Sequence, residues 1–301
     1  MRENREGALF TLVYGCPVST AVDPIEKKPL FHFLPGSKSL SLATVGCNFT
    51  CAFCQNADIS QMPRDHGRIV GSPLTPEQVV QQALDLGCAS ISYTYTEPTI
   101  YYEYARDCAR PATAAGLKNV FVTSGYISPE PLRQVAPYLD AVNIDLKSFR
   151  DETYRRYAGA RLQPVLDSLA NVKRLGIWLE VTTLVIPDLN DDPAELRETA
   201  RFITHLGSEV PWHLARFMPA HRMSAARETP LATLEQAREI GREEGLCHVY
   251  IENVPTRGTM DTVCPSCGRT LIVRRGFAMV ANDTRSGACP DCGTVIAGVN
   301  L

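Results

Sequence analysis

Three of the eleven cysteines lie within a stretch of eight residues, at positions Cys47, Cys51 and Cys54. In this arrangement three thiolates can reach one metal centre. An iron-sulfur cluster that only carries electrons normally takes four cysteines, so three leave one iron with an open coordination position. We therefore predict a [4Fe-4S] cluster that binds a small molecule directly. Free buried cysteines, and a zinc site completed by a fourth ligand elsewhere, are the alternative interpretations.

Four further cysteines form two CPxCG turns, with Cys264 and Cys267 in the first and Cys289 and Cys292 in the second. Four thiolates satisfy tetrahedral Zn²⁺ and leave no open position, so the pattern predicts a structural zinc ribbon. Such a short segment has too small a core to fold without a metal. Partner docking and a second iron-sulfur cluster are alternatives. Nucleic-acid binding is disfavoured because residues 258–301 carry four arginines, three aspartates and few aromatic side chains.

The elements that must position these cysteines alternate along the chain. Short β-rich segments recur from residue 39 to residue 252 and are separated by helical segments, a rhythm that is typical of a parallel α/β fold. The candidate strands are 39–45, 90–96, 119–125, 141–147, 178–186, 212–217 and 248–252. The three-cysteine loop follows directly after the first of them.

Capping residues mark the starts of helices between these strands. Thr75 and Ser128 each precede a proline and an acidic residue, which suits the first turn of a helix. Asp192 and Thr233 each have a Glu or Gln three residues later, the spacing of a capping box. Pro111 interrupts the helical segment that follows the second strand, so we expect that helix to be kinked or broken.

Polar residues gather toward the C-terminal ends of successive candidate strands. They are Thr94 and Thr96, Ser124, Asp145 and Lys147, Thr182 and Thr183, Arg216 and Glu252. Taken singly, each is explained as a satisfied polar group at the end of a strand. Because the active sites of β/α barrels lie at this end, the set as a whole predicts a cavity at a barrel mouth.

The composition excludes several classes of function. The chain has 301 residues, of which 45% are apolar, enough to bury one substantial core. With 30 basic and 33 acidic side chains the net charge is −3, which gives no electrostatic footprint for nucleic acid or an anionic membrane. We find neither a long apolar run nor a secretion signal, and therefore expect a cytoplasmic protein whose cysteines bind metal instead of forming disulfides.

The sequence around the first three cysteines resembles a known family. Residues 46–54, GCNFTCAFC, match the C-x3-C-x-aromatic-C signature of the radical S-adenosylmethionine (SAM) superfamily. Longer segments resemble pyruvate formate-lyase activating enzymes and, more closely, the radical SAM member of the AmmeMemoRadiSam group; they are 23–37, 46–60, 92–105, 116–128, 143–149, 180–191 and 211–219. The resemblance implies an α/β fold built as a partial (β/α)6 TIM-like barrel over residues 39–255. An N-terminal extension (1–38) precedes it and the zinc ribbon (256–301) follows.

Roles for individual residues follow from this resemblance. Cys47, Cys51 and Cys54 match the ligands of a [4Fe-4S] cluster, at which the family cleaves SAM reductively to a 5′-deoxyadenosyl radical. Phe53 matches the aromatic residue that lies against adenine. The chain is therefore expected to be an oxidoreductase that abstracts hydrogen atoms.

The resemblance also implies which residues contact SAM. Thr96 and Glu97 stand at the place of a Gly-Gly-Glu-Pro motif that binds the amino group of SAM, with Tyr95 and Thr96 replacing the two glycines. Asp145 and Lys147 match an Asp-x-Lys motif that contacts the polar groups of SAM. Further pocket residues are expected to be Thr182, Asn190 and Arg216, with Val185 and Ile186 near adenine.

Partners follow from the same resemblance. A reductant such as flavodoxin or ferredoxin is expected, and the hydrogen donor is expected to be a protein or peptide, as for glycyl-radical activating enzymes. The alternative is a small-molecule substrate handled together with Memo-type and AMMECR-type proteins. A non-catalytic iron-sulfur and zinc protein, acting as an electron carrier or scaffold, is the least favoured interpretation. No nucleic-acid or membrane partner is expected.

Overall fold

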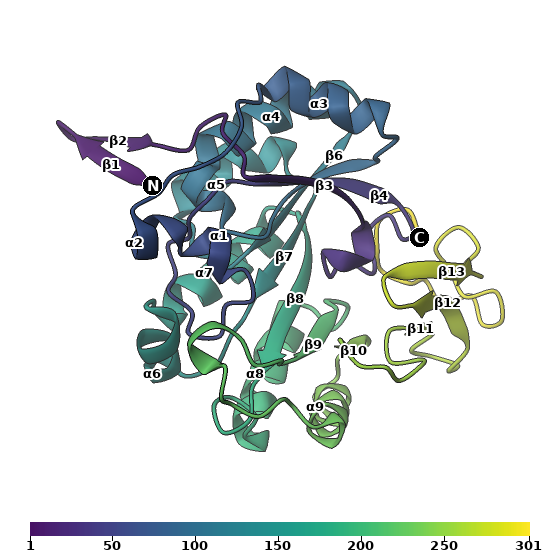
Figure 1. Ribbon diagram of the computed structural model, residues 1–301. Helices are drawn as coiled ribbons and strands as arrows, with labels where there is room; N and C mark the ends of the chain where they lie inside the picture. The colour runs from purple at the N-terminus through teal and green to yellow at the C-terminus, as the bar shows by residue number, and fades with distance from the viewer.

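A curved eight-stranded sheet forms the centre of the computed structural model, which describes residues 1–301 (Figure 1). Strands β4 to β10 run parallel in sequence order, and β3 pairs antiparallel with β4 at one edge. The strands of this sheet are β3 (Ser19–Pro24), β4 (Lys38–Ala43), β5 (Ser90–Tyr93), β6 (Lys118–Thr123), β7 (Ala141–Asp145), β8 (Trp178–Val185), β9 (Trp212–Arg216) and β10 (Val249–Glu252). The predicted parallel α/β fold is confirmed. All seven predicted strands are found: β4 to β9, each followed by a helix, make six β/α units, and β10 follows them. Strand β3 was not anticipated.

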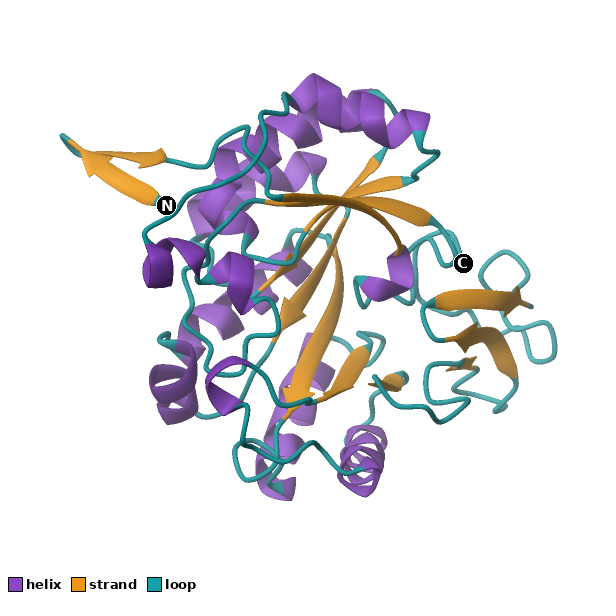
Figure 2. Cartoon of the chain, in the orientation of Figure 1, coloured by secondary structure: helices purple, strands orange, loops and turns teal.

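Helices cover the outer side of this sheet and connect its strands (Figure 2). The α-helices are α1 (Ala57–Ser60), α2 (Met62–His66), α3 (Pro76–Asp85), α4 (Tyr102–Ala114), α5 (Pro129–Val135), α6 (Asp151–Thr153), α7 (Leu162–Arg174), α8 (Pro193–Leu206) and α9 (Leu231–Glu243). Short turns are η1 (Ile25–Lys27), η2 (Pro98–Tyr101), η3 (Ala136–Tyr138), the π-turn η4 (Tyr154–Ala158) and η5 (His221–Met223). None of the helices combines the length and apolar character needed to cross a membrane.

Three of the four predicted helix starts are confirmed. Thr75 closes a reciprocal capping box at α3, and Ser128 precedes α5. The carboxylate of Asp192 accepts from the first backbone N–H groups of α8. The start predicted at Thr233 is wrong, because α9 already begins at Leu231, directly after Pro230. Proline cannot donate a backbone hydrogen bond, and here it sets the chain direction without a side-chain cap.

The helix predicted to be kinked or broken at Pro111 is not broken there. Helix α4 continues through this residue to Ala114. Pro111 lies in the last turn of the helix, and the face on either side of it is buried through Cys108 and Ala112. Packing of that face against the sheet therefore outweighs the one hydrogen bond that proline cannot donate.

The main apolar core fills the space between the sheet and its helices. It is a cluster of 54 buried residues that runs from Val13 to Ile251. Trp212 on β9 and Tyr93 on β5 are among its largest fully buried side chains. Burial of one large aliphatic or Phe side chain contributes about 1.5–3 kcal/mol, so the strands are held firmly in register. The side chains at the ends of the strands are therefore held in fixed positions.

A second, three-stranded antiparallel sheet forms a C-terminal module on the side away from the strand ends (Figure 1). Its strands are β11 (Thr262–Val263), β12 (Thr270–Arg275) and β13 (Ala278–Asn282). The guanidinium of Arg274 is buried and donates to the carbonyl of Phe31 at 2.7 Å. The module is thus tied to the segment that precedes β4. At the other side of the molecule, a hairpin of β1 (Arg2–Arg5) and β2 (Ala8–Thr11) projects from the body.

Candidate active site

The three-cysteine loop leaves the end of β4 and is held by backbone contacts on both sides. The N–H groups of Thr50 and Ala52 donate to the carbonyls of Ala158 and Tyr157, each at 2.8 Å. Arg222 donates its backbone N–H to the carbonyl of Ala52 at 3.0 Å. The loop is therefore fixed between the π-turn η4 and the 3-10 turn η5.

A side chain inside the loop anchors it to the core. Phe49 is buried and meets the rings of Tyr126 and Tyr154 edge-on, with ring centroids 5.2 and 6.3 Å away. Phe49 thus points into the core, whereas the three cysteines of the loop lie at the barrel mouth.

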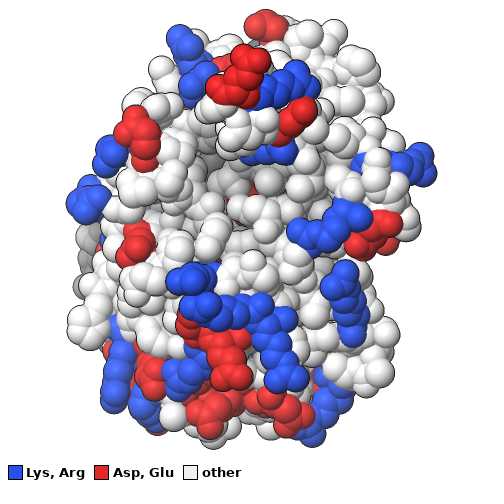
Figure 3. Space-filling view, turned by 90° about the vertical axis from the view of Figure 1, so that its left-hand side faces the viewer, with Lys and Arg blue, Asp and Glu red and all other residues white.

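The cysteines open into a cavity of about 220 Å³ at the C-terminal ends of the strands. Figure 3 shows the molecule from this side, with a hollow near its centre. Eight of the predicted site residues line the cavity, namely Cys47, Cys51, Phe53, Cys54, Thr96, Asp145, Lys147 and Thr182. Five do not line it, namely Glu97, Val185, Ile186, Asn190 and Arg216.

Burial controls the ionisation of the free thiols. It raises the pKa of Cys51 to about 11, and the positive charge of Lys147 acts in the opposite direction. It also raises the pKa of Cys47, where the carboxylate of Glu97 adds to the effect. A cation is therefore needed to hold these sulfurs as thiolates, and bound iron would supply that charge.

Lys147 and Asp145 form an ion pair on the wall of the cavity. The ammonium of Lys147 donates to the Asp145 carboxylate at 2.9 Å. Burial opposes the charge on Lys147, but Asp145 and Cys51 outweigh it and hold the Lys147 pKa above its usual value. The cavity thus presents a cation and an anion side by side, which suits a zwitterionic ligand.

Tyr95 occupies the first of the two positions where the family has glycine. Its φ angle is +62°, in the left-handed region that glycine adopts without strain. The backbone at this position therefore takes a conformation that glycine favours, although a tyrosine occupies it. The hydroxyl of Tyr95 donates to Asp23, and the ammonium of Lys28 lies 4.4 Å from its ring centroid.

Glu97 is fully buried beside the cavity, and its carboxylate is already satisfied by the chain. It accepts from the Thr123 hydroxyl at 2.7 Å, from the Ser124 N–H at 2.8 Å and from two groups of Thr99. Burial raises its pKa even though these hydrogen bonds act against the shift. Glu97 does not line the cavity, so the contact with SAM that was predicted for it stays a prediction.

Asn190 and Arg216 lie behind the wall. The amide of Asn190 donates to the carbonyls of Lys147 and Leu184, at 2.7 and 2.8 Å, and accepts from the N–H of Ile186. It therefore clamps the ends of β7 and β8. Arg216 is bound to the carbonyl of Thr229 and pairs with an acidic neighbour in the same loop, so it fixes the segment after β9.

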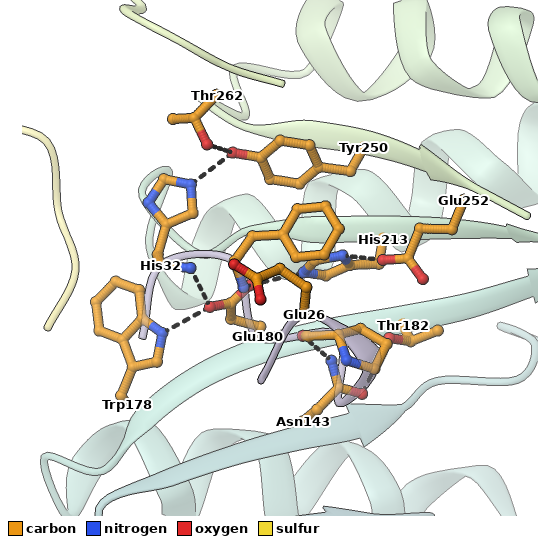
Figure 4. Close-up of polar contacts among 12 residues, drawn as sticks. Glu26, His32, Asn143, Trp178, Glu180, Thr182, His213, Tyr250, Glu252 and Thr262 are labelled. Atoms are coloured by element: carbon orange, nitrogen blue, oxygen red, sulfur yellow. Dashed lines mark hydrogen bonds and ion pairs between the residues drawn. The ribbon is translucent and has the colours of Figure 1, made fainter. Parts of the chain in front are cut away.

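Below the cavity, Glu180 on β8 and His213 on β9 form a fully buried polar network (Figure 4). Glu180 accepts from His213 at 2.7 Å and from three further donors, the backbone N–H groups of Phe31 and His32 and the indole of Trp178. The other ring nitrogen of His213 bonds to Glu252 at 2.5 Å.

The two carboxylates decide the charge of this histidine. Burial alone would lower the pKa of His213, but Glu252 and Glu180 outweigh it and raise the pKa to about 9. Burial also opposes the charge on Glu180, whose hydrogen bonds nevertheless hold its pKa below the usual value. His213 is therefore an imidazolium held between two carboxylates at neutral pH.

The strand register places the end of this network in one row with two residues of the cavity wall. Glu252 pairs with Ala215, which in turn pairs with Leu184, so the three form one row across β10, β9 and β8. Ala215 and Leu184 line the cavity. Paired residues of adjacent strands point to the same face of a sheet, and Figure 4 shows one oxygen of Glu252 facing His213 while the other points away.

The four C-terminal cysteines converge on one point. Their sulfur atoms all lie within 4.8 Å of one another. The Cys264–Cys292 and Cys267–Cys289 sulfur pairs are each 3.6 Å apart. Tetrahedral bonds of about 2.3 Å to a single zinc ion would separate the sulfurs by about 3.8 Å. The donor set therefore fits one tetrahedral metal ion.

Several residues of the wall were missed at the level of the sequence. They are Gln55, Asn56, Tyr95, Leu184, Ala215, Ser60 and Asn253. The hydroxyl of Ser60 lies 3.2 Å from the sulfur of Cys54. Position alone could have identified some of them, because Asn253 follows the last residue of β10 and Gln55 follows the last cysteine.

Comparison with known proteins agrees with this geometry. An uncharacterized protein of Methanocaldococcus jannaschii is 46% identical over 98% of this chain and 88% of its own length. The pyruvate formate-lyase-activating enzyme of Clostridium pasteurianum is 22% identical over 54% of this chain and 67% of its own. The solved structure of Streptococcus suis SuiB with its precursor peptide SuiA has a similar fold, with a TM-score of 0.57 and 14% identity over 76% of this chain and 51% of SuiB.

The family follows from a direct match. The sequence model of the radical SAM superfamily matches residues 41–203. This is more than half of the chain, and it includes the three-cysteine loop and strands β5 to β8. The chain therefore belongs to the radical SAM superfamily.

Proposed function

We propose that Cys47, Cys51 and Cys54 hold a [4Fe-4S] cluster and that the cavity beside them binds SAM. Membership of the superfamily implies both the cluster and SAM. When bound, they supply a low-potential electron and a sulfonium whose cleavage yields the 5′-deoxyadenosyl radical. The observation that carries the proposal is the opening of all three thiols into one cavity that also holds the Asp145–Lys147 pair.

The residues of the wall can bind each part of SAM. Lys147 is placed to bind the carboxylate, and Asp145 to bind the ammonium or a hydroxyl group. Phe53 offers an apolar face to the adenine. Thr182 presents a hydroxyl group that donates to Asn143 at 2.9 Å, so its lone pairs remain free for a donor on the ligand.

The residues behind the wall act through others in this proposal. Glu97 holds the segment that carries Thr96, while Asn190 fixes the ends of β7 and β8. Arg216 anchors the loop after β9. We assign these three as positioning residues of the SAM pocket.

Residues 39–255 are assigned to the partial (β/α)6 TIM-like barrel, and residues 256–301 to a zinc ribbon whose metal is structural. The sulfur spacing of 3.6 Å supports a single ion over a second iron-sulfur cluster. The N-terminal extension, residues 1–38, contributes β3 and the donors that Phe31 and His32 offer to Glu180.

For the hydrogen donor, we favour a protein or peptide. The similarity to a pyruvate formate-lyase-activating enzyme, and the fold shared with a SuiB structure that holds a precursor peptide, support this choice. A small molecule, modified together with Memo-type and AMMECR-type partners, is the alternative. A flavodoxin or ferredoxin is the proposed reductant.

The deciding experiment is anaerobic. The cluster is reconstituted in the wild type, in Cys51→Ala and in the control Cys247→Ala, which changes an exposed cysteine away from the loop. Iron content is measured, dithionite and SAM are added, and 5′-deoxyadenosine is quantified. We expect product from the wild type and Cys247→Ala, and none from Cys51→Ala. A wild type that binds and reduces its cluster but forms no product would support the electron-carrier interpretation instead.

A further inference from the structure

The π-turn η4 and the glycine after it cover the outer face of the cysteine loop. Gly159 has a φ of +67°, and a Cβ atom there would collide with the hydroxyl of Thr50. The carbonyl of Tyr157 accepts from the N–H of Ala52, the residue bonded directly to Cys51. One hydrogen bond therefore separates the surface turn from the backbone of a proposed cluster ligand. π-turns are rare and are often found at functional sites.

The same segment carries more basic than acidic side chains, although the whole chain carries a net charge of −3. Residues 150–161 hold four arginines and two acids. Arg156 and Arg161 are exposed and make no ion pair, and Arg156 lies 5.2 Å from the ring of Tyr157. Unpaired arginines on a surface favour contact with an anionic partner.

Two more arginines flank these positions. Arg155 is half exposed and pairs with Asp151 at 2.6 Å. Arg222 approaches the loop from η5, where its guanidinium lies 3.8 Å from Asp65. Figure 3 shows basic side chains gathered below the hollow, at the height of α6 in Figure 1, with acidic ones beside them. Exposed pairs of this kind are weak, so both arginines can turn to a partner.

We propose that this surface, defined by Arg155, Arg156, Arg161 and Arg222, docks an acidic electron-carrier protein. The inference rests on the proposed function. One electron passes from the reduced carrier, which is oxidised, to the cluster, which is reduced. Two hydrogen bonds to Ala52, one from its N–H to the carbonyl of Tyr157 and one from the N–H of Arg222 to its carbonyl, connect the docking surface to the cysteine loop. Opposite charges on the two proteins speed their encounter and orient the carrier.

The test reverses the charge of the surface. In Arg155→Glu/Arg156→Glu two exposed arginines of η4 are changed. The control Arg110→Glu/Arg174→Glu makes the same change of charge on α4 and α7. Reduction of the reconstituted cluster is followed by stopped-flow absorbance, with reduced flavodoxin as the acidic carrier and with dithionite as a small reductant. Binding of flavodoxin to the cluster-free chains is titrated separately.

We expect Arg155→Glu/Arg156→Glu to be reduced by flavodoxin on the order of tenfold more slowly at low salt, and to lose most of the salt dependence. Dithionite should reduce all three proteins equally. The cluster-free variant should bind flavodoxin more weakly than the control. The proposal would be overturned if the two variants had equal rates of reduction by flavodoxin, equal salt dependence of these rates and equal affinity for flavodoxin. A defect that affects only the turnover of the substrate protein would also overturn it. A chain that holds no reducible cluster would refute the proposed function, while the titration still tests the docking surface.

Discussion

Replacement of His213 by glutamine removes the only positive charge between Glu180 and Glu252. Glu180 keeps three other donors, whereas Glu252 loses its one protein donor. The cost therefore falls on Glu252. Removing one partner of a buried ion pair typically costs about 3–5 kcal/mol. The rise of the His213 pKa from 6.5 to about 9 corresponds to about 3 kcal/mol, which agrees with the lower end of that range.

The sign of the pH dependence follows from the direction of this shift. A histidine whose pKa is higher in the folded state stabilises the fold fully below its unfolded value of 6.5, and the contribution is lost as the pH rises through about 9. The difference in unfolding free energy between the wild type and His213→Gln should therefore shrink by about 3 kcal/mol as the pH rises from 6.5 to above 9.

Urea unfolding of the zinc-loaded, cluster-free chains at several pH values measures this difference. His248→Gln is the matched control, because burial holds the pKa of His248 well below 6.5 and that side chain stays neutral throughout the range. The double variant His213→Gln/Glu252→Gln should recover part of the loss, since it removes the unpaired carboxylate. A wild-type advantage over His213→Gln that stays constant or grows with pH would refute a charged His213.

Three further predictions concern Asn190, the cysteine loop and the metal site of the C-terminal cysteines. Asn190→Ala removes three hydrogen bonds to buried backbone groups, so we expect a loss of about 2–4 kcal/mol in the free energy of unfolding by urea and weaker SAM binding by calorimetry. A loss below about 0.5 kcal/mol would contradict the role of Asn190 in holding the ends of β7 and β8. Gly159→Ala should lower the iron bound per reconstituted chain while leaving zinc unchanged, because the added methyl group displaces Thr50; normal iron content would argue against this contact. Cys289→Ser should release zinc and lower the melting temperature, whereas Cys247→Ser should do neither.

Local patterns in the sequence were sufficient for the elements and for much of the cavity. The positions of Asp145, Lys147 and Thr182 follow from strand ends, because parallel strands present these ends at one edge of the sheet. The alternation of strands and helices predicted the seven parallel strands, since each strand is a short apolar run between capped helices. The local sequence was therefore sufficient to predict the position of a residue wherever a single strand or helix determines that position.

Long-range contacts explain what could not be predicted. Glu97 matches a motif, yet Thr123 at the end of the next strand and Ser124 directly after it donate hydrogen bonds to its carboxylate oxygens. Asn190 was expected in the pocket, but its amide is bound by backbone groups of two strands. Neither outcome is visible in a pattern of neighbouring residues, because both depend on how separate elements meet in the fold.

The wall of the cavity depends on segments from both ends of the chain. Phe31 donates its N–H to Glu180, and its carbonyl accepts from Arg274 of the C-terminal module. Glu180 holds His213, which holds Glu252 in the row of residues that faces the cavity. The C-terminal module lies on the side of the molecule away from the mouth, yet it is connected to the wall by four consecutive side-chain or backbone contacts (Figure 1). Because each buried polar group in this series needs its neighbour, we expect a metal bound by the C-terminal cysteines to help order this part of the cavity wall as well.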